Sequence, residues 1–131
     1  MKYIISTSFF LIVNLSICFS QTQGELNETA CNSYQKADKK LNEIYQKVLK
    51  EYALDTIFIK KFKTAQRQWV RLRDADIEAR FLPGEFYGTI ESMCRCAILQ
   101  DMTNDRIKYI SLWIEGLEDQ EGCKGTVKEK E

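Results

Sequence analysis

Three long stretches of the sequence repeat apolar residues at steps of three and four, and this period restricts the possible folds more than any other feature. The stretches run over residues 26–52, 58–79 and 90–117. Steps of three and four place side chains on one face of an α-helix. No segment alternates apolar and polar residues for long enough to predict a β-strand. The sequence therefore predicts an all-α protein with three main helices.

Capping residues mark where the first two helices begin. Thr22 and Glu25 have the spacing of a capping box, in which each side chain accepts the other residue's backbone N–H. The stripe that follows ends near Tyr52, and Asp55 is the predicted cap of the second helix. The first connection is therefore short, and the second helix is expected to run back along the first.

Proline and glycine mark the remaining helix ends. Pro83 and Gly84 follow Phe81 and are predicted to stop the second helix there. Thr89 is predicted to cap the third helix and Gly116 to end it. Short connections between three helices predict a small up-down-up bundle, in which the first and third helices are parallel.

Charged residues interrupt or border the apolar stripes around Trp69. Asp76 falls on the second stripe and Arg106 on the third, and Arg73 lies one helical turn beyond the tryptophan. We expect Trp69 to be a core anchor with opposite charges packed around it, because a lone buried charge is very costly. The alternative is a binding site or an acid–base pair. Asp74 and Asp76 are two residues apart and therefore point to different sides of a helix, which argues against a catalytic pair.

The sequence contains none of the common signatures of enzymes or cofactor sites. It has no histidine, no glycine-rich phosphate loop and no activated-serine motif. Its 19 basic and 19 acidic residues give a formal net charge of zero, which provides no electrostatic basis for binding nucleic acid or an anionic membrane. We therefore predict no catalytic residue, no cofactor, no metal ion and no nucleic-acid partner.

Residues 1–20 have the features of a secretory signal peptide. One lysine precedes an apolar run, and small residues follow the run. The run is too short for a membrane span, so we predict cleavage after Ser20 and a mature protein that starts at Gln21. Cys18 offers the alternative of a lipid anchor, but Ile17 stands where a lipid-attachment signal has a small residue. A soluble exported product is therefore preferred over a lipid-anchored one.

Four cysteines remain after removal of the leader, and an even number in a small exported domain indicates disulfides. They are Cys31, Cys94, Cys96 and Cys123. A zinc site fits less well, because Cys94 and Cys96 are too close for a zinc knuckle and no histidine is present. In the predicted bundle, Cys31 lies beside the start of the third helix, so its partner is Cys94 or Cys96. We prefer Cys94, because it shares the apolar stripe of that helix.

Residues 118–131 form a charged, glycine-containing tail behind the predicted helical domain of residues 21–117. The tail is expected to be mobile unless Cys123 holds it. A bond from Cys123 to Cys96 would require the third helix to bend, because a straight helix runs about 30 Å beyond Cys96. The residues that follow the helix reach only about 25 Å. Thr103, which could act as an internal cap, is where such a bend is expected.

Several of these segments combine into a pattern that resembles a known family. "TQGELNETAC" at 22–31 is followed by "AQRQWVRLRDAD" at 65–76 and by "TNDRIKYISLW" at 103–113. The pattern resembles the N-terminal-type domain of the lysozyme inhibitor LprI family. The motif residues, which we interpret as structural, are Trp69, Arg73, Asp74, Thr103 and Arg106. The resemblance implies a small, helical, cysteine-containing bacterial protein that is periplasmic or secreted.

Two functions from different classes remain open. The resemblance implies a protein that binds and inhibits a lysozyme, whereas the alternative is an envelope interaction or stress module with an unknown protein partner. A hydrolase is less consistent with the arrangement of the charged residues. An inhibitor needs a protruding element, and the connection "FLPGEFYGT" at 81–89 offers one through Phe81, Glu85, Phe86 and Tyr87. The preferred interpretation of this segment is nevertheless a plain connection with its aromatic rings packed into the core.

Overall fold

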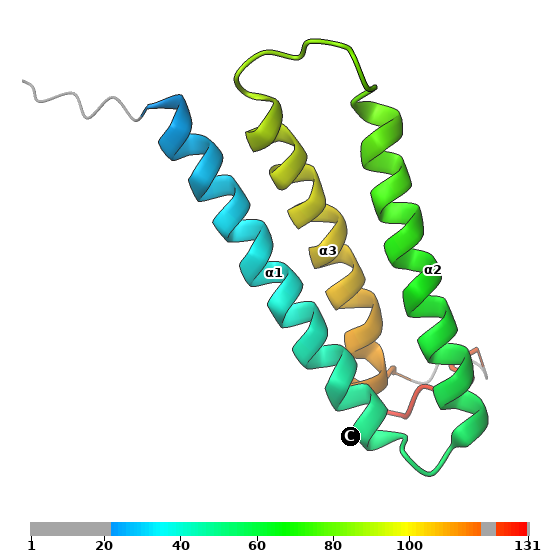
Figure 1. Ribbon diagram of the computed structural model, residues 1–131. Helices are drawn as coiled ribbons and strands as arrows, with labels where there is room; N and C mark the ends of the chain where they lie inside the picture. Colours follow the sequence, from blue (N-terminus) through cyan, green and yellow to red (C-terminus); the bar gives the residue numbers. More distant parts are fainter. Residues whose placement is uncertain (1–21, 119–122, 131) are drawn as a thin grey trace, which may run out of the picture.

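The computed structural model describes residues 22–118 and 123–130, and this part of the chain folds into three long helices. The helices are α1 (Gln23–Glu51), α2 (Thr56–Arg80) and α3 (Glu91–Glu115). α1 and α3 run in the same direction, and α2 runs in the opposite direction (Figure 1). The prediction of an all-α, up-down-up bundle of three main helices is therefore confirmed.

The predicted leader lies outside the described residues. This holds for its cleavage after Ser20 and for the alternative of a lipid anchor at Cys18. In the part of the chain that the structure describes, no helix combines the length and the apolar character that crossing a membrane requires.

The predicted caps of α1 and α2 are confirmed. Thr22 Oγ1 accepts the backbone N–H of Glu25 at 3.3 Å, and the Glu25 carboxylate accepts the backbone N–H of Thr22 at 2.8 Å. Asp55 accepts the backbone N–H of Phe58 at 2.8 Å. Each bond satisfies an N–H that has no partner inside its helix, so these side chains set where the helices begin.

The predicted cap of α3 is wrong. The helix begins at Glu91, and Ile90 occupies the capping position without a side-chain hydrogen bond. The backbone N–H of Glu91 instead donates to the carbonyl of Gly88 at 3.3 Å, so a turn precedes the helix. Thr89 contributes its own carbonyl, which accepts a hydrogen bond from the side chain of Asn27 at 3.1 Å and joins this turn to α1.

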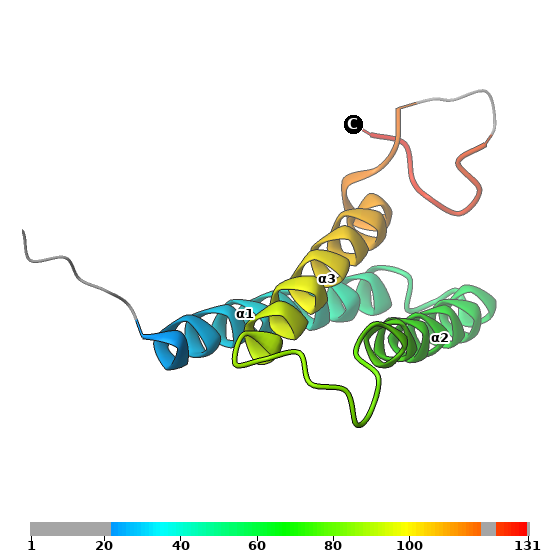
Figure 2. The same ribbon diagram turned by 90° about the horizontal axis from the view of Figure 1, so that it is seen from above.

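α1 and α3 form the closely packed pair of the bundle, and α2 stands apart from it. α3 crosses over α1 in Figure 2, whereas α2 lies to one side. α2 makes far fewer contacts with α3 than α1 does. Small buried side chains suit the close approach of α1 and α3; they are Ala37, Thr103 and Ser111. The loose packing of α2 leaves open surface on both of its flanks.

The hydrophobic core lies toward the end of the bundle that holds the connection between α1 and α2. Its buried members are Leu41, Val48, Phe58, Phe62 and Ile110. Stacked rings continue it, since the centroids of Tyr45 and Phe62 are 5.6 Å apart and those of Phe58 and Phe62 are 5.2 Å apart. Toward the opposite end, buried hydrophobic residues outside this cluster are fewer; they are Ala37, Ile77 and Phe81.

The inner face of α2 differs from the predicted stripe in its second half. Leu72 and Asp76, which continue the stripe by sequence, are exposed. The buried residues are instead Arg73 and Ile77, which follow Trp69 at steps of four. A row of residues at steps of four is inclined to the helix axis, and it is the row that an inclined helix turns toward its neighbours. The expectation that Asp76 joins a buried polar cluster is therefore wrong.

The tail beyond α3 is held by its backbone rather than by a cysteine. The backbone N–H of Leu117 donates to the carbonyl of Lys128, and the N–H of Lys130 donates to the carbonyl of Leu117, both at 2.9 Å. Val127 is buried, whereas Cys123 is exposed and has no disulfide partner in the described part of the chain. The prediction that the tail is mobile unless Cys123 holds it is therefore wrong for residues 123–130.

Gly116 and two aromatic residues explain how the tail can pack so closely. Gly116 ends α3 with a φ of 84°, and a Cβ atom there would lie 2.7 Å from the carbonyl oxygen of Glu129. Only glycine tolerates both that conformation and that approach. The indole N–H of Trp113 donates to Thr126 Oγ1 at 3.2 Å, and the Tyr52 hydroxyl lies 3.1 Å from the Thr126 carbonyl. These contacts fasten the tail to the ends of α1 and α3.

Candidate functional site

The motif tryptophan lies between two guanidinium groups. The guanidinium carbon of Arg73 is 5.2 Å from the centroid of the Trp69 ring, and that of Arg106 is 5.7 Å from it. Arg73 comes from α2 and Arg106 from α3, so the indole joins cations from two helices. Cation–π attraction of this kind contributes about 0.5–2 kcal/mol per pair, depending on desolvation. The predicted aromatic and charged cluster therefore exists, although Trp69 is half-buried rather than fully enclosed.

Arg73 is the charged residue that links α1 to α2. It is 8% exposed, and it contacts Asp38 of α1 at 3.3 Å and its neighbour Asp74 at 2.8 Å. Its guanidinium also lies 5.8 Å from the Tyr34 centroid. Burial opposes its charge, but the hydrogen bond with Asp74 and the fields of Tyr34, Asp74 and Asp38 raise the pKa of Arg73 overall. The Arg73 guanidinium is therefore charged, paired with two carboxylates, and connects α1 to α2.

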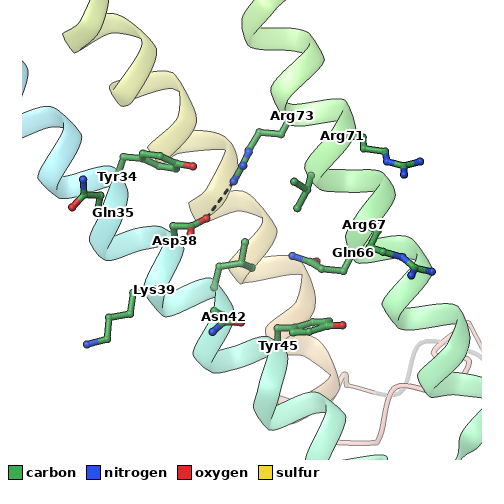
Figure 3. Close-up of a pocket in the computed structure, with 12 residues that line it drawn as sticks. Tyr34, Gln35, Asp38, Lys39, Asn42, Tyr45, Gln66, Arg67, Arg71 and Arg73 are labelled. Carbon is green, nitrogen blue, oxygen red and sulfur yellow. Dashed lines mark hydrogen bonds and ion pairs between the residues drawn. The ribbon is translucent and has the colours of Figure 1, made fainter.

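A groove of about 800 Å³ separates α1 from α2 at this level. Figure 3 shows Tyr34, Asp38 and Tyr45 reaching from α1 toward α2, while Arg73 and Gln66 reach back from α2. Burial raises the pKa of both Tyr34 and Tyr45 above the usual value, so both phenols are neutral near pH 7. The groove has no pair of carboxylates placed for acid–base work, and its polar groups mainly bridge the two helices.

We expect the replacement of Arg73 with alanine to lower the free energy of unfolding by about 1–3 kcal/mol. The change removes the ion pairs and the packing of the arginine stem. Both carboxylate partners are 54% exposed, and their access to water limits the loss. Urea denaturation measures the effect. Arg71→Ala is the matched control, because Arg71 lines the same groove but is exposed and takes part in neither ion pair of Arg73; equal effects of the two changes would refute the assigned role.

The two motif residues on α3, Thr103 and Arg106, have no carboxylate partner of the kind that Arg73 has among the described residues. Thr103 is fully buried within the uninterrupted helix α3, and its hydroxyl has no hydrogen-bond partner among the described residues. It therefore marks neither a bend nor an internal cap. Arg106 donates to Gln66 at 3.0 Å and has no carboxylate partner in the described part of the chain. The expectation that an aspartate neutralises Arg106 is wrong, because the nearest candidate by sequence pattern, Asp76, is exposed.

The connection between α2 and α3 is a rigid, protruding loop. Its two ends are pinned by Phe81 and Tyr87, whose ring centroids are 5.4 Å apart in an edge-to-face arrangement. The Tyr87 hydroxyl accepts the backbone N–H of Leu82 at 3.0 Å. Arg95 of α3 lies 4.7 Å from the Phe81 centroid and donates to the Phe81 carbonyl at 3.1 Å. These contacts fix the base of the loop against α3.

Residues 82–86 form the exposed tip of this connection, and we call them the tip loop. Phe86 is 90% exposed, Leu82 is 54% exposed, and Glu85 is exposed as well. Gly84 adopts a φ of 85° and permits the reversal of the chain at the tip. The four loop residues singled out by sequence therefore divide: Phe81 and Tyr87 pack inward, as expected for a plain connection, whereas Glu85 and Phe86 face solvent.

The disulfide pairing departs from the predicted one. Cys31 of α1 bonds to Cys96 of α3, with their Cα atoms 4.9 Å apart, whereas Cys94 and Cys123 form no disulfide within the described residues. Cys96 shares a face of α3 with Thr103 and Ile110, at steps of seven, and that face is buried. The prediction that Cys31 pairs with the start of the third helix is confirmed, and the preference for Cys94 is wrong.

Three side chains that contact the cluster or the loop were not predicted from the sequence: Asp38, Gln66 and Arg95. Asp38 and Gln66 lie next to apolar stripe positions, and nothing in their spacing marks them as partners of Arg73 and Arg106. Arg95 carried a usable signal, because Glu91 precedes it by four residues and the two form an ion pair at 2.7 Å. Such a pair indicates a solvent-side helix contact, but its role in holding the loop depends on tertiary structure.

Comparison with known proteins identifies a family. The model of the family described as "Lysozyme inhibitor LprI" matches residues 19–110, which is well over half of the chain. No curated protein matches the sequence, and no solved structure matches the fold. The matched range contains the disulfide, the guanidinium–tryptophan cluster and the tip loop. The chain therefore belongs to the lysozyme inhibitor LprI family.

Proposed function

We propose that this chain is an exported binding protein that inhibits a lysozyme by placing the tip loop in the enzyme's substrate cleft. Two facts support the proposal together: the family match over residues 19–110 and the nearly complete exposure of Phe86 on a loop with a fixed base. The Cys31–Cys96 disulfide fits export, because such bonds persist in oxidising compartments. The function is binding rather than catalysis.

The tip loop has the physical properties of an interface anchor. Aromatic residues that enter a partner's pocket contribute more binding energy than most contacts around them. A loop that is already ordered loses little conformational entropy when it binds, and the Phe81–Tyr87 pair supplies that order. Glycosidases carry two carboxylates in a cleft that must stay open to a polysaccharide. A short apolar projection can block such a cleft without any chemical reaction.

We expect Phe86→Ala to weaken lysozyme inhibition by about 30-fold, the effect of an interface anchor worth about 2 kcal/mol. Leu82→Ala should weaken it by a smaller factor, because its side chain is less exposed. The measurement is the lysis rate of bacterial cells with lysozyme and increasing amounts of the purified mature protein. Leu54→Ala is the matched control, since Leu54 is 99% exposed in the connection at the opposite end of the bundle; this variant should inhibit like the unmodified protein.

Circular dichroism and urea denaturation check that each variant folds. The proposal fails if no lysozyme of any type is slowed by an excess of folded protein. It also fails in its structural part if Phe86→Ala and Leu54→Ala inhibit equally well. Either result can be separated from misfolding, because all three positions are on the surface.

The second function is an envelope interaction module that binds another protein without inhibiting an enzyme. The observation that favours it is the groove between α1 and α2, which neither helix fills with its own side chains. Binding there would depend on Tyr34 and Tyr45 and would be insensitive to Phe86. A pull-down from envelope extract with Phe86→Ala and Tyr45→Ala separates the two functions, since only the inhibitor requires the tip loop.

A further inference from the structure

A second cavity, of about 600 Å³, lies between α2 and α3 on the flank away from the groove. Four of its lining residues are aromatic; they are Phe58, Phe62, Tyr109 and Trp113. Thr126 of the packed tail closes one end, and the side chains of Ile57 and Tyr109 are exposed and extend the apolar wall to the surface. Small-molecule sites have this size and this mainly apolar lining.

Arg106, which lines this cavity, has no carboxylate partner among residues 22–118 and 123–130. Arg106 is half-buried, and its Nε donates to the neutral amide oxygen of Gln66 at 3.0 Å. Its terminal nitrogens have no hydrogen bond within the described residues, and its guanidinium rests 5.4 Å from the Tyr109 centroid. Burial lowers the pKa of Arg106 from its usual value, although a guanidinium stays charged in proteins. A desolvated cation without an anionic partner is unfavourable, and a bound anion would relieve that cost.

The remaining charges of the cavity do not supply the missing anion. Lys61 is a second cation in the lining. Asp55 is the single lining carboxylate, and its side chain accepts the backbone N–H of Phe58 as the cap of α2. Arg73, the buried arginine of α2, differs from Arg106 because it contacts two carboxylates. The walls of the cavity therefore combine apolar rings with a net positive charge.

We propose that this cavity binds a small amphiphilic carboxylate, such as a medium-chain fatty acid, with the carboxylate on Arg106 and the alkyl chain against the rings. The two free terminal nitrogens of a guanidinium match the two oxygens of a carboxylate in a bidentate pair. The alkyl chain displaces water from the exposed faces of Tyr109 and Trp113, and removing this apolar surface from water favours binding. The site is distinct from the tip loop, so it requires no lysozyme.

Decanoate is the probe, and intrinsic fluorescence is the readout, because Trp113 lines the cavity and Trp69 contacts Arg106. We expect decanoate below its micelle concentration to change the fluorescence saturably at pH 7. Decan-1-ol, which has the same chain and no charge, should bind at least about tenfold more weakly, because it cannot form the charge-assisted pair. Equal affinities for the acid and the alcohol would overturn the proposal.

Variants test the same site in the full mature chain. Arg106→Gln should reduce decanoate affinity at least about tenfold and leave decan-1-ol binding unchanged. Arg71→Gln, an exposed change elsewhere on α2, should have no effect on either ligand. Ala65→Phe covers the case in which Arg106→Gln fails to fold, because Ala65 is exposed and lines the cavity; its ring should block both ligands. Unchanged decanoate binding in Ala65→Phe would place the ligand elsewhere.

Discussion

Replacing both Cys31 and Cys96 with serine should lower the free energy of unfolding by about 4 kcal/mol. The disulfide closes a loop with a sequence separation of 65, and the chain-entropy relation for a loop of that length gives this magnitude. The bond holds α1 to α3 at the end of the bundle away from the main hydrophobic cluster. It also closes the chain around the loosely packed helix α2. Urea denaturation of the oxidised protein and of the double variant measures the difference.

Two single changes serve as controls for this prediction. Cys94→Ser and Cys123→Ser remove unpaired thiols, so each should change stability by less than about 1 kcal/mol. Peptide mapping under non-reducing conditions should recover Cys31 joined to Cys96. A loss of stability in Cys94→Ser as large as in the double variant, together with a Cys31–Cys94 peptide, would show that the pairing is wrong.

Ile110→Ala should lower the free energy of unfolding by about 3–4 kcal/mol, within the usual range for shortening a buried isoleucine. Ile110 is 0% exposed and belongs to the buried cluster with Leu41 and Val48 of α1 and Phe62 of α2. All three helices contribute to that cluster, so a cavity there weakens every interface of the bundle. Chemical denaturation followed by circular dichroism gives the value.

Leu54→Ala is the control for the core prediction, because it removes the same class of side chain from a fully exposed position. Its effect should stay within about 0.5 kcal/mol. A cost below about 1 kcal/mol for Ile110→Ala would mean that the cluster is not closely packed. The two helices of the α1–α3 pair would then have to be held mainly by the disulfide.

Local chemistry made the helix limits predictable, except for the start of α3. Thr22, Glu25 and Asp55 bind backbone groups within four residues of themselves, so their role follows from spacing alone. Gly116 ends α3 for a similarly local reason, since it adopts a positive φ. The bundle topology then followed from helix number and connection length.

Features that depend on how one helix sits on another were not predictable from the same patterns. The face of α3 that packs against α1 follows steps of seven through Cys96, Thr103 and Ile110. The apolar stripe through Cys94 predicted a different face of the same helix. For α2, the inclination of the helix decided that Arg73 is buried and Asp76 exposed. Neither orientation is encoded in the period of a single helix.

The site was predicted in part for the same reason. Trp69, Arg73 and Arg106 could be grouped from the sequence because their stripes converge. The hydrogen-bond partner of each arginine lies on a different helix from the arginine itself: Asp38 of α1 binds Arg73, and Gln66 of α2 binds Arg106. The folded tail was not predicted because its hydrogen bonds join Leu117 to Lys128 and Lys130, which are distant from it in sequence. Its charged composition indicated mobility, and the burial of Val127 outweighs that tendency.

Photo-crosslinking from the tip loop shows where this loop lies on a lysozyme that the protein inhibits. A benzoylphenylalanine in place of Phe86 is expected to crosslink, on irradiation, to residues that line the substrate cleft of a lysozyme that the protein inhibits. The same label in place of Leu54, at the opposite end of the bundle, should yield no product. Mass spectrometry of the crosslinked peptides identifies the attachment sites. Crosslinks from position 86 to a surface away from the cleft, or their absence while inhibition persists, would contradict the proposed mode of inhibition.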